Sequence, residues 1–124
     1  MNKSQQAGFT LIELVMVIVI LGVLAAVALP KFVSVDADAK QAAVSGVAGA
    51  LSSASAINYA SRKANGSKGN AVGNCQDVAT SLQGGLPSGY TIATATITPV
   101  DTTKTDCTVT GNSLTANFTA TSIN

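Results

Sequence analysis

The first 30 residues contain the most apolar segment of the chain. Residues 9–29 are apolar apart from Thr10 and Glu13, and a polar stretch that carries Lys3 precedes them. A helix of this length spans about 30 Å, the thickness of a bilayer core. The pattern predicts a membrane helix over 9–30. Its N-terminus is expected on the cytoplasmic side, because the charges that follow the segment are of mixed sign.

A second periodic segment follows Pro30. Apolar residues recur at intervals of three and four, which predicts an amphipathic helix over 31–62. The face expected to be buried consists of Phe32, Val35, Ala39, Ala42, Ala43, Gly46, Val47, Ala50, Ala54, Ile57 and Ala60. Four small residues would let another backbone come close: Gly46, Gly49, Ser53 and Ala56. Asn58 is expected on the polar side. We expect most of the apolar face to form the core, and the rest to contact neighbouring chains.

The remaining residues are rich in Gly, Asn, Thr and Ser. Clusters of Gly and Asn predict a loop over 63–89, with a short helical segment at 75–83. From residue 90 onward apolar residues alternate with threonine, which predicts an antiparallel sheet of three or four strands over 90–122. Gly111-Asn112 is a hairpin signal within it. The strand residues expected to face the core are Ile92, Ala95, Ile97, Val109, Leu114 and Phe118. The fold class is therefore α+β.

Charge and composition argue against several functions. Charged residues make up 10% of the chain, the formal net charge is +1, and there is no histidine. An imidazole base is therefore absent and the few carboxylates are scattered, so we expect no enzyme and no cofactor. Arg62, Lys63 and Lys68 form a small basic cluster, but without interleaved aromatic residues a solvated loop is favoured over a DNA site.

Two cysteines, Cys75 and Cys107, are far apart in the sequence. A zinc site needs more ligands, so no metal site is expected here. In an exported domain they are expected to form one disulfide, which would contribute about 3 kcal/mol by loop-closure entropy. The alternative is two reduced, buried cysteines in a cytosolic domain. Cys107 is expected to open the middle strand.

The small residues near the N-terminus are arranged unlike those of an ordinary secretory signal. Ala7 and Gly8 precede the apolar segment, whereas a secretory cleavage site follows it. A cut after Gly8 would remove only the polar leader and keep the anchor. Glu13 lies inside the apolar segment, where an ionisable side chain is costly and normally has a partner.

The stretch GFTLIE at 8–13, the apolar segment after it and PKF at 30–32 together resemble type IV prepilins and the related type II secretion pseudopilins. The similarity is close over 1–35 and looser beyond it, where it is nearest to the mannose-sensitive haemagglutinin type of pilin. It implies the type IV pilin fold, a long N-terminal helix packed on a small antiparallel sheet. The parts would be a leader at 1–8, a filament-core helix at 9–30 and a globular head at 31–124.

The resemblance also implies roles for individual residues. A membrane aspartic peptidase would cut the Gly8–Phe9 bond and methylate Phe9 with S-adenosylmethionine. Glu13 would then meet the ammonium group of Phe9 on a neighbouring chain and set the axial register of the subunits. The alternative is a Glu13 that snorkels to the membrane surface. Gly22 and Pro30 would permit local unwinding in a packed filament.

The function that this implies is a structural subunit, a homo-oligomer in a helical filament. It would reside in the inner membrane among lipids, be assembled by the pilus machinery there, and then be displayed as an extracellular pilus for adhesion, motility, biofilm formation or DNA uptake. DNA and host surfaces are candidate partners. The alternative is a type II secretion pseudopilin, for which a calcium site at Asp101 and Asp106 is disfavoured by Lys104. A plain single-span membrane protein also stays open.

Overall fold

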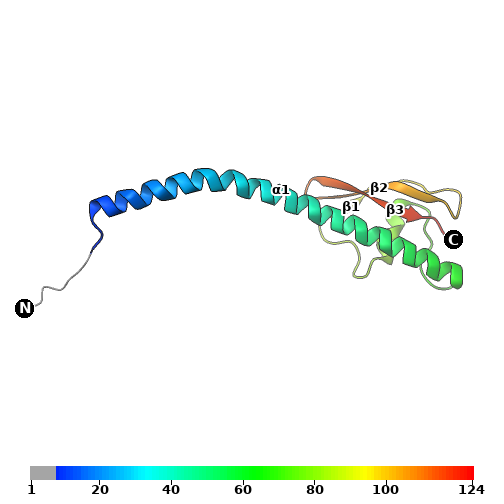
Figure 1. Ribbon diagram of the computed structural model, residues 1–124. Coiled ribbons are helices and arrows are strands. Elements are labelled where there is room, and N and C mark those ends of the chain that lie inside the picture. The colour runs from blue at the N-terminus through cyan, green and yellow to red at the C-terminus, as the bar shows by residue number, and fades with distance from the viewer. Residues whose placement is uncertain (1–7) are drawn as a thin grey trace, which may run out of the picture. The chain divides into compact units, whose positions relative to one another are not determined.

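A computed structural model describes residues 8–124 (Figure 1). These residues fall into two compact units, one that ends at Ala37 and one that comprises 38–124. The elements in chain order are helix α1 (Leu11–Ala64), a 3-10 helix η1 (Cys75–Ser81), and strands β1 (Thr91–Ile92), β2 (Thr103–Gly111) and β3 (Leu114–Thr121). The fold is the expected α+β arrangement of a long N-terminal apolar helix with a small antiparallel sheet, consistent with the type IV pilin fold.

The described part of the first unit consists almost entirely of the apolar half of α1. Its large apolar side chains, from Phe9 to Val35, are 45–81% exposed. Within the part of the chain that the structure describes, α1 is the one helix long and apolar enough to cross a membrane. This half of the helix contributes nothing to the core of the head, so its stability depends on an apolar environment outside the chain.

The helix is continuous through Gly22 and Pro30. Proline removes one backbone hydrogen bond inside a helix, yet here the flanking residues keep helical geometry. The isolated chain therefore has no break at either residue. The expected unwinding concerned the packed filament, and it stays a prediction.

The sheet has the strand order β1-β2-β3, and both pairs are antiparallel. Gly111 pairs with Leu114, so the hairpin turn is formed by Asn112 and Ser113, both at positive φ. The predicted hairpin is confirmed, but its turn lies one residue after Gly111-Asn112. Gly111 is instead a strand residue against which the Tyr90 ring packs so closely that a Cβ at Gly111 would clash with it.

Two strand boundaries also differ from the prediction. β2 begins at Thr103, not at Cys107, because an irregular register between Lys104 and Cys107 lets a polar segment extend the strand. After β1 the chain leaves the sheet, so the apolar alternation that begins at residue 90 forms a strand only over Thr91–Ile92. Residues 95–97 bond to the loop instead, with Cys75 N donating to Ala95 O (2.9 Å) and Ile97 N donating to Gly73 O (2.8 Å).

The buried face of α1 is not the predicted one. The helix buries Val44, Ala48, Leu51, Ser55 and Asn58. The predicted face is exposed except for Val47 and Ala54, which are half-buried. The small residues Gly46, Gly49, Ser53 and Ala56 are exposed as well. Alanines and glycines offer little area to bury, so the larger side chains of the neighbouring face form the core.

Asn58 is buried because its side chain is hydrogen-bonded to the backbone of the loop after α1. Its side-chain amide pairs with the backbone of Asn70, accepting from Asn70 N (2.7 Å) and donating to Asn70 O (2.8 Å). This pair of bonds fastens the loop after α1 to the helix. Apolar periodicity contains no information about such a contact, which explains why Asn58 was expected on the solvent side.

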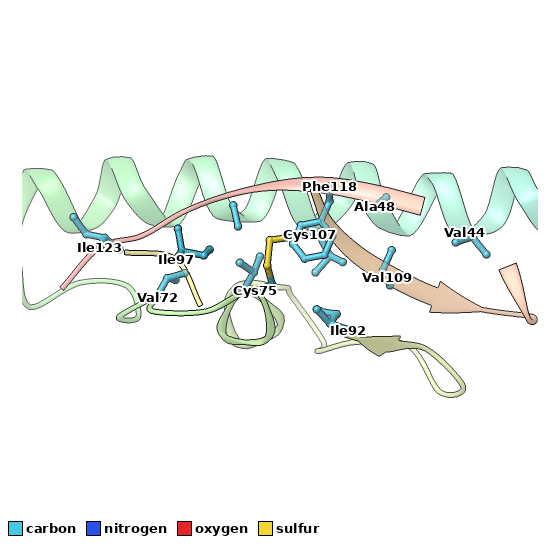
Figure 2. Packing of buried hydrophobic residues seen from close by; sticks show 13 residues of the cluster. Val44, Ala48, Val72, Cys75, Ile92, Ile97, Cys107, Val109, Phe118 and Ile123 are labelled. Atoms are coloured by element: carbon cyan, nitrogen blue, oxygen red, sulfur yellow. A yellow bond between two sulfur atoms is a disulfide. The ribbon is translucent and has the colours of Figure 1, made fainter. Parts of the chain in front are cut away.

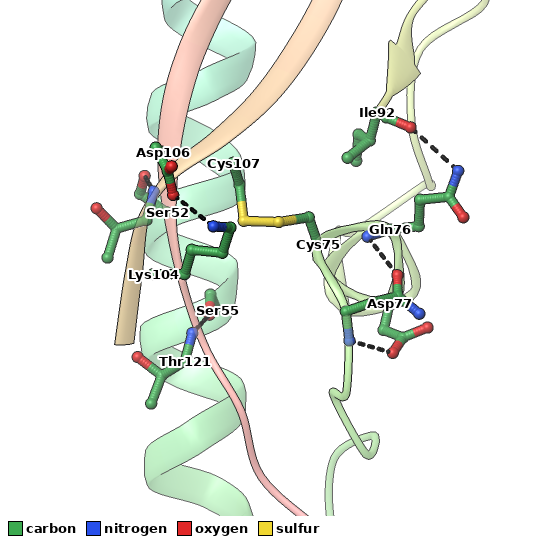
Figure 3. The surroundings of a disulfide bond; sticks show 12 residues. Ser52, Ser55, Cys75, Gln76, Asp77, Ile92, Lys104, Asp106, Cys107 and Thr121 are labelled. Carbon is green, nitrogen blue, oxygen red and sulfur yellow. Dashed lines mark hydrogen bonds and ion pairs between the residues drawn. A yellow bond between two sulfur atoms is a disulfide. The ribbon is translucent and has the colours of Figure 1, made fainter. Parts of the chain in front are cut away.

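Serines of α1 accept hydrogen bonds from backbone N–H groups on the free edge of β3. Thr119 N donates to Ser52 Oγ (2.9 Å) and Thr121 N donates to Ser55 Oγ (3.0 Å); Figure 3 shows Ser55 beside Thr121. Unpaired N–H groups on an edge strand are a template for pairing with another chain. The helix therefore closes this edge with hydroxyl groups while it supplies the core with apolar ones.

The core of the head lies between α1, the sheet and η1 (Figure 2). The expected strand residues Ile92, Ile97, Val109 and Phe118 are all buried in it, whereas Ala95 and Leu114 pack at its margin. The expected disulfide is present: Cys75 and Cys107 are both buried and their Cα atoms are 5.7 Å apart. It joins the start of η1 to the middle of β2.

Replacing Ser55 by alanine should destabilise the head by about 1–3 kcal/mol, because the Thr121 N–H loses its partner in a partly buried place. Ser53→Ala is the matched control. Ser53 is exposed on the same helix, and its loss should change stability by less than about 0.5 kcal/mol. Chemical unfolding of the full chain in detergent measures both, and equal effects would contradict the edge-closing role of Ser55.

Candidate functional site at the start of helix α1

The residues singled out by the sequence at the N-terminal end lie together. Gly8, Phe9, Thr10 and Glu13 line one open concavity of about 340 Å³ at the start of α1. All four are exposed, and a Cβ at Gly8 would have no atom within 4 Å. The Gly8–Phe9 bond is therefore open to approach in the isolated chain. The rest of the leader, residues 1–7, lies outside the described residues.

Glu13 has a partner within its own chain. Its Oε2 accepts a hydrogen bond from Thr10 N (2.9 Å), and its backbone N–H donates to Thr10 Oγ1 (3.2 Å). This reciprocal pair is a capping box, in which the residue before a helix and the third residue within it satisfy each other's backbone groups. A carboxylate in the first turn is also favoured by the helix dipole.

Thr10 is a residue that sequence reasoning missed. The signal was present, since a Thr followed three positions later by Glu and then by an apolar run is the sequence form of a capping box. Glu13 was interpreted only through its charge. The structure adds that its carboxylate has a fixed place, held against the backbone beside Phe9.

The arrangement leaves acceptor capacity on Glu13. A carboxylate has two oxygens, and the bond to Thr10 uses Oε2. A cation that approached the other oxygen would meet a carboxylate whose position is already set. The site can therefore hold an ammonium group without losing the cap that starts the helix.

The other carboxylates singled out by the sequence are paired with lysines. Lys63 Nζ lies 2.7 Å from Asp101 Oδ2, and Lys104 Nζ lies 2.9 Å from Asp106 Oδ1. These hydrogen-bonded ammonium groups lower the pKa of both aspartates and the Asp101 contact raises the pKa of Lys63. Across residues 8–124, no three His, Cys, Asp or Glu side chains are grouped as metal ligands.

The basic cluster is also dispersed in the head. Lys63 is engaged by Asp101, and Arg62 Nη1 donates to Gly69 O (3.3 Å). Lys68 makes no side-chain hydrogen bond or ion pair with any residue in the described range. Arg62 therefore holds the loop after α1, Lys63 holds the segment before β2, and Lys68 is the one cation of the three without a side-chain partner among the described residues.

Comparison with known proteins identifies the N-terminal segment and two relatives. Residues 3–29 match the family described as the prokaryotic N-terminal methylation motif. The chain is 43% identical over 84 residues to the type IV narrow pilus major component PilA5 of Thermus thermophilus, covering 68% of this chain and 66% of that protein. It is 44% identical over 54 residues to the type II secretion system core protein G of Pseudomonas aeruginosa, covering 44% and 38%.

The matched segments span just under two thirds of the first relative and well under half of the second. No solved structure gives a significant match. The methylation motif covers the apolar helix and its start, and the longer match extends the similarity beyond that segment. Together with the long apolar helix and the small antiparallel sheet, the methylation motif and the similarity to PilA5 support a type IV pilin.

Proposed function

We propose that this chain is the structural subunit of an extracellular type IV pilus, processed in the inner membrane and then polymerised. The observation that carries the proposal is the apolar half of α1, whose large side chains are at least 45% exposed among residues 8–124. A bilayer first, and then the same helices of neighbouring subunits, would supply the missing apolar contacts. The filament would serve adhesion, motility, biofilm formation or DNA uptake.

The proposal assigns three parts to the chain. Residues 1–8 are the leader, 9–30 the helix of the filament core, and 31–124 the head. The membrane peptidase would cut after Gly8, where the backbone is unobstructed, and methylate Phe9. No catalytic role is assigned to the chain itself, because these steps are carried out on it by the processing enzyme.

Glu13 is proposed to guide assembly. Cleavage creates a positive amine at Phe9, next to the capped start of the helix. In a bundle of apolar helices, a carboxylate and an ammonium group of neighbouring chains attract strongly when their geometry is good, and removal of one partner is then costly. Because Thr10 already fixes the carboxylate, an incoming subunit would find one axial position in which its amine is paired.

The second candidate function is a pseudopilin of type II secretion. It is supported by the 44% identity over 54 residues to a core protein of that system. Fibre location separates the two functions. Processed subunits in long fibres sheared from the cell surface would support the pilus, whereas processed subunits confined to the envelope would support the pseudopilus.

Replacing Glu13 by glutamine should sharply reduce the number of fibres. The amide oxygen of glutamine can still accept from Thr10 N, so the cap is kept while the charge is lost. Thr10→Val keeps the charge and removes the hydroxyl acceptor, and should reduce fibres less. Electron microscopy of sheared fibres, normalised to the amount of processed subunit in the membrane, compares them. Normal fibres with Glu13→Gln would contradict the charge pairing.

Replacing Gly8 by valine should leave the leader attached. The space around Gly8 is open, so the substitution has no clash to cause in the chain itself, and any loss of processing must arise at the peptidase. Intact-mass analysis of the membrane-extracted subunit measures the outcome. The unsubstituted chain should begin at Phe9 and carry one added methyl group. An unsubstituted subunit that retains residues 1–8 in fibres would contradict the proposed cleavage.

A further inference from the structure

Two large apolar side chains are exposed on the second compact unit. Among residues 38–124, the exposed large apolar side chains are Ile57, which is 67% exposed, and Val100, which is 45% exposed. Isolated apolar residues on a surface need no explanation by themselves. Here, however, one of the two side chains lies beside a positive charge, and the other lies beside a negative charge.

Ile57 lies in a groove between α1 and the loop that follows it. The groove has a volume of about 610 Å³, and α1 lines it with Ala50, Ala54 and Ile57 and with the polar residues Ser53, Asn58 and Ser61. These three apolar residues belong to the face of α1 that was expected to be buried; Ala50 and Ile57 are exposed, and Ala54 is half-buried. Lys68 lines the groove from the loop and has no side-chain partner among the described residues. The groove thus combines an apolar floor with one unpaired cation.

Val100 lies on a corner that the fold holds in place. Ser122 Oγ donates to Pro99 O (2.8 Å) and accepts from Thr102 N (3.0 Å), while Asp101 N donates to Ser122 O (3.0 Å). The Asp101 side chain is 44% exposed, so its contact with Lys63 leaves room for a second cation. The corner thus presents an apolar side chain and an anion next to each other.

Within one chain the corner does not fill the groove, since no residue of the corner lines the groove. Lys63 holds the corner through Asp101, and its Nζ lies 5.7 Å from the centre of the Tyr59 ring. With 3.6 residues per turn, Tyr59 and Lys63 lie about 160° and 120° around the helix from Ile57. The two surfaces therefore face different directions.

We propose that the groove at Ile57 receives the Val100–Asp101 corner of a second copy of this chain. Val100 would cover Ile57, Ala50 and Ala54, and Lys68 would approach the Asp101 carboxylate of that copy. A contact between two different surfaces of a subunit is heterologous, and a heterologous contact whose rotation does not close into a ring repeats as an open helical filament. The inference rests on the proposed function and specifies which surfaces of neighbouring heads meet.

Cysteine cross-linking in assembled fibres tests the contact. The two native cysteines form a disulfide, so an added cysteine is the only one that reacts with a short bismaleimide. Cells would express the unsubstituted chain together with Ile57→Cys, with Val100→Cys or with both variants. The unsubstituted chain ensures that fibres form. We expect cross-linked dimers only in fibres that contain both variants, and none among detergent-extracted subunits before assembly.

Two matched controls sharpen the test. Ser88→Cys, an exposed residue outside both surfaces, replaces Val100→Cys and should give no dimers with Ile57→Cys. Lys68→Glu in the Ile57→Cys chain should lower the dimer yield several-fold, whereas Lys68→Arg should keep it. Fibres without dimers, or equal dimers with Ser88→Cys, would overturn this interface alone. An unsubstituted chain that forms no extracellular fibres would overturn the proposed function as well.

Discussion

The first half of α1 cannot remain in water, and the rest of the molecule is arranged around that constraint. Eighteen large apolar side chains between Phe9 and Val35 are exposed in the isolated chain. At about 25 cal/mol for each Å² of apolar surface removed from water, such a helix has a strong tendency to enter a bilayer or a bundle of its own kind. Both environments are apolar, so the free energy that separates them is small. A few polar contacts can therefore direct the chain from one to the other.

The head has to fold without help from that half of the helix. Its core contains 13 buried apolar residues, which is a small number for a domain, and the Cys75–Cys107 disulfide joins two segments of it. The serines of α1 and Asn58 satisfy backbone groups that a larger protein would cover with more structure. The β3 edge of the sheet is thereby closed to strand pairing at Thr119 and Thr121.

The sequence was sufficient for the features that depend on long patterns. The apolar segment, the helix after Pro30 and the alternation in the strands follow from composition and spacing, and the pairing of Cys75 with Cys107 follows once the domain is taken to be exported. The buried face of α1 was not predictable in this way, because alanine and glycine occur all around the helix. Its choice depends on Val44 and Leu51, and on Ser55 and Asn58, whose partners Thr121 and Asn70 are remote in the sequence.

At the candidate site at the helix start, too, the sequence pattern predicts which residues matter, whereas the contacts between them are seen only in the structure. Gly8, Phe9 and Glu13 could be selected from the sequence, since a carboxylate in an apolar run requires an explanation. The geometry depends on Thr10, which turns Glu13 from a charge on a mobile side chain into an acceptor fixed at the backbone. A fixed carboxylate loses less conformational freedom when it binds a cation than a mobile one does. On this reasoning, a hydrogen bond within each subunit prepares the charge through which subunits are proposed to find their register.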